Sequence, residues 1–227
     1  MKIGIIGYGV VGKAAAHTLS KKYKIVKFDK YAEYDKFEDF EQCDFVFISV
    51  PTPFDCDKNK VDESAITESL DKLEKIDFVN IVIIKSTVPP GACSRYSEKY
   101  NLNIVFNPEF LRESTTPNED FENQDTIVIG TQHKEIFESV KEMYKRVAVP
   151  HAKYYHTSTT EAEMIKCSQN TMLASRVALA NMIFDACQKY QIDYNKVREI
   201  AFDNFEILGP HMVQVPGPDG KRGFGGK

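Results

Sequence analysis

The sequence predicts an α/β protein with a doubly wound, Rossmann-like, mostly parallel sheet, followed by a long-helix dimerisation segment. Three observations predict this fold. Short β-branched runs alternate with helical patterns from the first residue. The turn after the first run carries glycines at positions 7, 9 and 12. The chain from residue 159 to residue 191 contains neither proline nor glycine.

The expected strands are six apolar runs, and most of them are separated by stretches of helical character. The runs are residues 2–7, 24–29, 44–50, 80–86, 103–107 and 125–130, and the clearest helical stretches are residues 10–22 and 63–75. Continuous apolar strands that alternate with helices indicate a parallel sheet covered on both faces. Right-handed crossovers then make the sheet doubly wound.

The pattern changes after Pro150, and we expect three parts: residues 1–150, 151–208 and 209–227. Residues 159–191 predict one helix of about 33 residues, roughly 50 Å long. Thr160 and Glu163 have the spacing of a capping box at its start. A shorter helix is expected at residues 195–202, and the last part is rich in glycine and proline without periodicity.

The middle of the long helix, residues 172–187, is apolar on more than one face. A helix that packs on a single neighbour does not need this pattern. A central core helix within the chain and the core of a dimer both fit the pattern. We favour a homodimer because little helical sequence follows.

The composition excludes several classes of protein. The formal net charge of −4 gives no basic field for nucleic acid. The five cysteines are widely spaced and form no Cys/His metal pattern, so we expect reduced thiols and no metal. The amino terminus lacks the features of a signal peptide, and no apolar run approaches the ~20 residues of a membrane span. We therefore expect a cytoplasmic protein without membrane partners.

The sequence "GYGVVG" at residues 7–12 follows the first strand and opens the first helix. Glycines at this spacing allow a tight turn and a close approach by a pyrophosphate at the helix N-terminus. Asp29 ends the second strand, where a carboxylate accepts both ribose hydroxyls and repels a 2′-phosphate, so NAD is favoured over NADP. The neighbouring Lys30 argues the other way. Glycines needed only for packing, and a solvated Asp29, are the alternatives.

Three further turns with unusual residues follow strands of the predicted sheet. They are "PTP" at 51–53, "STVPPG" at 86–91 and "NPEFLRES" at 107–114. Ligands of doubly wound sheets bind at the carboxyl ends of the strands, so these turns are expected to gather at one site with the glycine turn. Strand-ending prolines and surface carboxylates at Glu109 and Glu113 are the alternative explanations.

Lys166 and Asn170 are four residues apart and share a face near the start of the long helix. A cation next to an amide donor suits a developing oxyanion. A solvated lysine is the alternative.

Together these segments resemble the UDP-glucose/GDP-mannose 6-dehydrogenase family. The resemblance rests on "GYGVVG", "SVPTP", "KSTVPPG", "NPEFLRES", "EAEMIKCSQNTMLASRVALAN" and "PGPDGKRGFGG", which occur in this order. It implies an NAD-dependent, two-step oxidation of the C6 alcohol of a nucleotide sugar to a carboxylate, through a cysteine-bound thioester. UDP-glucose is the leading substrate. UDP-N-acetylmannosamine, UDP-N-acetylglucosamine and GDP-mannose remain open, because "HMVQVPGPDGKRGFGG" departs from the usual form of the uridine loop.

The resemblance assigns roles residue by residue. Lys166 and Asn170 would stabilise oxyanions, Thr87 and Glu109 would organise water, and Glu113 would lie beside the nicotinamide. The residues expected to bind NAD are Gly7, Tyr8, Gly9, Val10, Val11, Gly12, Asp29, Lys30, Val50, Pro51, Thr52, Pro53, Ser86, Thr87 and Glu113. Those expected to bind the sugar nucleotide are Glu109, Phe110, Leu111, Arg112, Glu113, Lys166, Asn170, Gly223, Phe224 and Gly225.

The resemblance also places the nucleophilic cysteine directly after Lys227, and none of the five cysteines present inherits that role. We expect a truncated sequence. A chain that ended at Lys227 would instead be a dimeric module that binds NAD and a sugar nucleotide without full activity. The open reading frame past Lys227 discriminates between the two. A 3-hydroxyacid dehydrogenase shares the glycine turn but lacks "NPEFLRES" and "GFGG".

Overall fold

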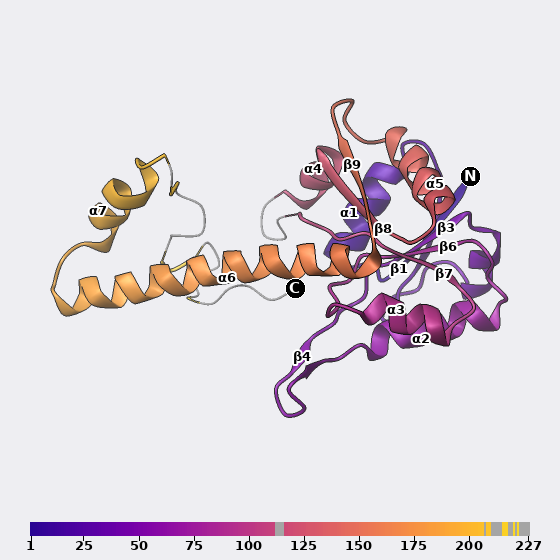
Figure 1. Ribbon diagram of the computed structural model, residues 1–227, viewed down its shortest axis with the longest axis horizontal. Coiled ribbons are helices and arrows are strands. Elements are labelled where there is room, and N and C mark those ends of the chain that lie inside the picture. Colours follow the sequence, from indigo (N-terminus) through magenta and orange to yellow (C-terminus); the bar gives the residue numbers. More distant parts are fainter. Residues whose placement is uncertain (112–115, 207, 210–214, 218–219, 221, 223–227) are drawn as a thin grey trace. The chain divides into compact units, whose positions relative to one another are not determined.

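The computed structural model describes residues 1–111, 116–206, 208–209, 215–217, 220 and 222 (Figure 1). The chain forms two compact units, Met1–Cys167 and Ser168–Lys227. The first unit is built on a seven-stranded sheet with helices on both faces, and the elements of the second unit are helices.

The large sheet has the strand order β2-β1-β3-β6-β7-β8-β9. Its strands are β1 (Lys2–Ile6), β2 (Lys24–Phe28), β3 (Phe45–Ile48), β6 (Ile81–Ile84), β7 (Asn103–Phe106), β8 (Thr126–Gly130) and β9 (Lys153–Thr157). Within this sheet, β2, β1, β3, β6 and β7 run parallel. β8 pairs antiparallel with β7, and β9 is parallel to β8. The predicted mostly parallel sheet is confirmed, with its last two strands reversed.

The strand order places a switch point between β1 and β3. The chain passes from β1 to β2 on one side and then crosses to β3 on the other side of β1. In doubly wound sheets, ligands bind outside the carboxyl ends of the strands at such a switch. The turns that leave β1 and β3 therefore border the expected crevice.

Side chains of the strands alternate between two buried cores, one on each face of the sheet. Phe47 and Ile83 lie in one core, and their neighbours Ile48 and Ile84 lie in the other. Both faces are covered, which explains why the strands are apolar throughout. One core packs on α1 (Val10–Leu19), α4 (Pro117–Glu122) and α5 (Lys134–Lys145). The other packs on η1 (Phe37–Gln42), α2 (Ser64–Lys75) and α3 (Ala92–Lys99).

Neither β9 nor the small hairpin of β4 (Phe54–Asp55) and β5 (Lys60–Val61) was predicted from the sequence. β9 is an edge strand, and its residues are half-buried or exposed. An edge strand needs no apolar run, so "KYYHT" carries little strand signal. The sheet thus continues past residue 150, into the range expected for the helical part.

The long helix α6 (Thr159–Lys189) is confirmed to within two residues of its predicted end. The predicted capping box of Thr160 and Glu163 is wrong. Ser158 and Glu161 form the box instead: Ser158 Oγ accepts from the Glu161 amide at 3.2 Å, and Glu161 Oε2 accepts from the Ser158 amide at 2.8 Å. The two patterns overlap in sequence, and the Glu163 carboxylate has other partners, described below.

The second unit contains the remainder of α6, the short helix α7 (Tyr194–Arg198) and the π-helical turn η2 (Glu199–Asp203). The Asp193 side chain caps α7 by accepting from the Asn195 amide at 2.9 Å. A small core of Ala180, Cys187, Tyr194 and Val215 joins these elements. None of the helices in the described part of the chain is long and apolar enough to cross a membrane.

We predict that Gly130→Ala destabilises the first unit by about 1–3 kcal/mol. A Cβ at this position would lie 2.8 Å from Ala162 Cβ and 3.0 Å from both Ser158 O and Thr159 Cα, so it would push the start of α6 away from β8. Gly9→Ala is the matched control, because its Cβ would meet nothing within 4 Å. Urea unfolding measures both. Equal stability of the two variants would contradict the tight packing.

Candidate functional site

The turn between β1 and α1 has no room for side chains at two of its glycines. Gly7 has a φ of +87°, and a Cβ there would lie 2.5 Å from Ser49 O. A Cβ on Gly12 would lie 2.0 Å from Gly7 O. Gly9 faces open space and caps α1 without a side-chain hydrogen bond. The first amides of a helix lack acceptors within the helix, so this turn offers N–H groups to an anion.

Asp29 lies where β2 ends and ties that strand to the glycine turn. Its Oδ2 accepts from the Tyr8 amide at 2.8 Å, and its Oδ1 accepts from the Tyr31 amide at 2.9 Å. A carboxylate has about four acceptor sites, so both oxygens keep capacity for ribose hydroxyls. Lys30 forms an ion pair with Glu68 of α2 at 2.9 Å. This pairing weakens the case that Lys30 attracts a 2′-phosphate.

The turns that leave β3 and β6 are bound to each other by two hydroxyl groups. Thr52 Oγ1 donates to Thr87 O at 2.7 Å, and Ser86 Oγ donates to Val50 O at 2.7 Å. Pro51 and Pro53 flank Thr52 and are exposed. The structure thus joins the predicted residues of these two turns at the carboxyl edge of the sheet.

Glu109 follows β7, and only 4% of its surface is exposed. Its Oε1 accepts from the amides of Phe110 and Leu111 at 2.9 and 3.1 Å. Lys166, which is also buried, donates from Nζ to Glu109 O and lies 5.3 Å from the centre of the Phe110 ring. Lys166 therefore joins the start of α6 to the turn that follows β7.

Lys85 is a buried residue of this region that the sequence analysis missed. It follows β6 directly, and its Nζ lies 3.0 Å from Glu109 Oε2. The signal was present in the alternation of the strand, because Lys85 is in phase with Ile83 and therefore points into the core. A lysine at an inward position requires a buried partner.

Glu163 is the second missed residue, because it had been assigned to the capping box. It is fully buried, and its carboxylate accepts from the Gly91 amide at 2.5 Å and from the Cys93 amide at 2.7 Å. These amides open α3, so a carboxylate of α6 caps α3. One turn later, Cys167 Sγ donates to Val88 O at 3.6 Å. The start of α6 therefore also holds the turn that follows Thr87.

The other predicted site residues lie in several parts of the chain. Asn170 lies four residues after Lys166 on α6, in the second unit. Tyr8, Val10, Val11 and Lys30 lie in or beside the turns after β1 and β2. Arg112, Glu113, Gly223, Phe224 and Gly225 lie outside the described residues.

Three of the five thiols have raised pKa values. Burial raises the pKa of Cys43 to about 12 and raises the pKa of Cys93 well above its ordinary value. Burial and the Glu163 carboxylate raise the pKa of Cys167, against the opposing effect of Lys166. Nucleophilic cysteines have lowered pKa values. None of these three thiols has that property.

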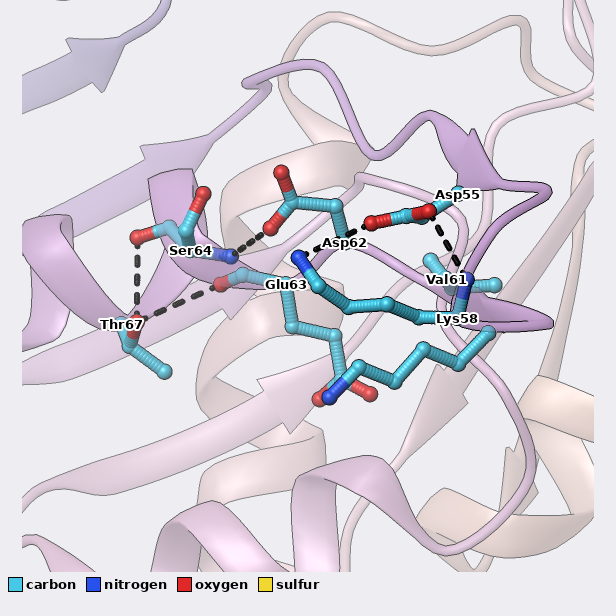
Figure 2. Close-up of a pocket in the computed structure, with 8 residues that line it drawn as sticks. Asp55, Lys58, Val61, Asp62, Glu63, Ser64 and Thr67 are labelled. Carbon is cyan, nitrogen blue, oxygen red and sulfur yellow. Dashed lines mark hydrogen bonds and ion pairs between the residues drawn. The ribbon is translucent and has the colours of Figure 1, made fainter.

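The hollow shown in Figure 2 is a different feature, between the hairpin and the start of α2. It measures about 310 Å³, and none of the predicted site residues lines it. Two of its carboxylates are engaged locally: Asp55 pairs with Lys58 at 3.0 Å, and Asp62 accepts from the Ser64 amide at 2.9 Å. Among the described residues, no group of His, Cys, Asp and Glu side chains could hold a metal ion.

The glycine turn, the carboxylate after β2 and the switch point together define a dinucleotide-binding fold of the doubly wound class. Comparison with known families identifies it further. The NAD binding domain of the UDP-glucose/GDP-mannose dehydrogenase family matches residues 26–148, and its central domain matches residues 160–227. The chain belongs to the UDP-glucose/GDP-mannose dehydrogenase family, and its cofactor is NAD.

Individual relatives agree with this assignment. A UDP-glucose 6-dehydrogenase of Rickettsia prowazekii is 34% identical over 195 residues, which cover 83% of this chain and 43% of the relative. The chain thus spans less than half the length of that relative.

Two solved structures share the fold. The UDP-glucose dehydrogenase of Pyrobaculum islandicum matches with a TM-score of 0.80 at 22% identity, over 93% of this chain and 58% of its own. A UDP-D-ManNAc dehydrogenase of Pyrococcus horikoshii also reaches 0.80, at 20% identity, over 93% and 59%. The fold alone therefore does not distinguish the sugar.

We predict that Glu163→Gln destabilises the first unit by about 1–3 kcal/mol. The glutamine NH₂ group would face the amide N–H of Gly91 or Cys93. Both groups are donors, so one hydrogen bond to the backbone would be lost. Glu135→Gln is the matched control, because Glu135 is exposed on α5 and its side chain is 77% accessible. Chemical unfolding measures both variants. A Glu163→Gln protein as stable as the control would show that the carboxylate does not cap α3.

Proposed function

We propose that this chain supplies the NAD-binding and central parts of a nucleotide-sugar 6-dehydrogenase, with UDP-glucose as the leading substrate. The overall reaction converts a C6 alcohol, water and two NAD⁺ into a carboxylate, two NADH and three protons. The observation that carries the proposal is the meeting of Lys166 with Glu109 at the carboxyl edge of the sheet. Family membership and the similarity to UDP-glucose 6-dehydrogenases support the same reaction.

The residues at the switch point fit NAD. Gly7 and Gly12 have no room for a Cβ, and without side chains there a pyrophosphate can approach the backbone amides of the turn. Asp29 retains acceptor capacity for ribose hydroxyls. NAD supplies the hydride acceptor for each oxidation. The turns at Val50–Pro53 and Ser86–Thr87 would border the nicotinamide, with Glu113 beside it.

The protein groups would act by electrostatics and positioning. The Lys166 ammonium and the Asn170 amide would stabilise the oxyanions that develop at C6. Thr87 and Glu109 would organise the water that completes the second oxidation. Phe110, Leu111 and Arg112, with Gly223, Phe224 and Gly225, would contact the sugar nucleotide. None of the three thiols with raised pKa values is proposed as the nucleophile.

We also propose that a second copy of the chain covers the apolar side chains of the second unit. Met172, Leu179 and Met182 on α6 are 66%, 57% and 67% exposed, and their spacing places them on one face of the helix. Exposed apolar surface of this kind indicates an interface. Sedimentation at micromolar concentration should give twice the chain mass, and a monomer would contradict this part of the proposal.

We predict that the full-length gene product reduces two NAD⁺ per molecule of one nucleotide sugar. The test measures NADH yield across UDP-glucose, UDP-N-acetylmannosamine, UDP-N-acetylglucosamine and GDP-mannose. A yield of two equivalents with UDP-glucose supports the leading assignment, and two equivalents with another sugar correct the substrate. A burst limited to one equivalent would reject the four-electron reaction. NAD binding without any NADH would favour a binding module.

A further inference from the structure

One enclosed charge in the first unit is an ammonium group to which the proposed reaction gives no role. The side chain of Lys85 has no exposed surface. Its Nζ lies 3.0 Å from Glu109 Oε2, donates to Asn107 Oδ1 at 2.9 Å and lies 5.2 Å from the centre of the Phe121 ring. A lysine placed for packing alone does not require this set of polar and aromatic partners.

We infer that Lys85 is the positioning residue for Glu109, the buried counter-ion that keeps its carboxylate charged and fixes its direction. The inference rests on the proposed function, because that function is what gives Glu109 a part in the reaction. Lys85 itself follows β6 directly and would contact neither substrate nor NAD.

The two oxygens of Glu109 are held in different ways. Oε1 accepts from the amides of Phe110 and Leu111, which belong to the turn itself. Oε2 has no aligned hydrogen bond among the described residues, and its close partner is the Lys85 ammonium. The direction of the carboxylate therefore depends on Lys85, since the turn controls only one of its oxygens.

Lys85 is in turn held by Asn107, and residues of α5 and β8 bind the Asn107 side chain. Tyr144 of α5 donates to Asn107 Oδ1 at 2.5 Å, and Asn107 Nδ2 donates to Val128 O of β8 at 2.7 Å. The Asn107 amide oxygen thus accepts from both Tyr144 and Lys85. Buried polar groups that are satisfied in this way form a rigid network, so the ammonium cannot move away from Glu109 without breaking several contacts.

The test uses four variants of the chain: Lys85→Met, Glu109→Gln, the double variant and Lys145→Met. Without its counter-ion, a buried carboxylate is expected to take up a proton. Infrared difference spectra should therefore show a protonated-carboxyl band in Lys85→Met that is absent from the wild type and from the double variant. Lys145→Met is the matched control, because it removes an exposed lysine that pairs with Glu142, and it should show no band.

Thermal unfolding of the same variants gives an independent measurement. Lys85→Met should lower Tm more in the wild-type background than in the E109Q background, because the second background has no unpaired carboxylate. If Lys85→Met fails to fold while the double variant folds, the inference is supported. If both fail to fold, or if the Tm losses are equal and no protonated-carboxyl band appears, Lys85 serves packing and the inference is overturned.

The kinetic measurement separates this inference from the proposed function. In the full-length gene product, Lys85→Met should lower kcat by about 10²-fold or more with little change in KM, since a positioned base contributes ~10²–10⁴-fold. An unchanged kcat would overturn the positioning role. If the wild type itself reduces no NAD, the proposed function fails, while the infrared result still decides whether Lys85 keeps Glu109 charged.

Discussion

The candidate site depends on one constraint. The first turns of α6 contact two separate turns of the chain, the one that follows β6 and the one that follows β7. Glu163 binds the amides that open α3, and Lys166 binds the carbonyl of Glu109. The two residues are three apart on one helix, so a single rigid element sets the spacing between the turn after β6 and the turn after β7. Gly130 makes this contact possible, because a larger residue would hold the helix away from β8. The positions of Thr87 and Glu109 therefore depend on packing that begins more than forty residues later in the chain.

Buried charge is concentrated at this same edge of the sheet. Lys85 and Glu109 form an enclosed ion pair, and the Glu163 carboxylate is held by backbone amides. Ion pairs of this kind contribute little net stability, because desolvation offsets most of their attraction, whereas loss of one partner is costly. These contacts instead fix the orientation of each charged group, because each group is held by contacts from different elements. An edge built this way can present charged groups at fixed positions to a bound dinucleotide.

The sequence predicted the elements of the fold better than the contacts within the site. The first six strands of the sheet and α6 were predicted because continuous apolar runs and a long stretch without proline or glycine are local signals. The strand β9 was missed because an edge strand can be polar, and the reversal of β8 depends on pairing rather than on composition. The alternation of the strand indicated that Lys85 points inward, but its partners Glu109 and Tyr144 could not be predicted, because they lie on other parts of the chain. The role of Glu163 was misassigned because two capping-box patterns overlap, and only the folded structure shows that the Gly91 and Cys93 amides bind this carboxylate.

We propose that NAD binds at the carboxyl edge of the sheet, across the switch between β1 and β3. Titration of NAD into the ¹⁵N-labelled chain, followed by amide chemical shifts, tests this most directly. The largest shifts are expected in the glycine turn at residues 7–12, at Asp29 to Tyr31 and at Ser86 and Thr87. Shifts confined to the hollow beside the β4–β5 hairpin, or to the opposite edge of the sheet, would contradict it.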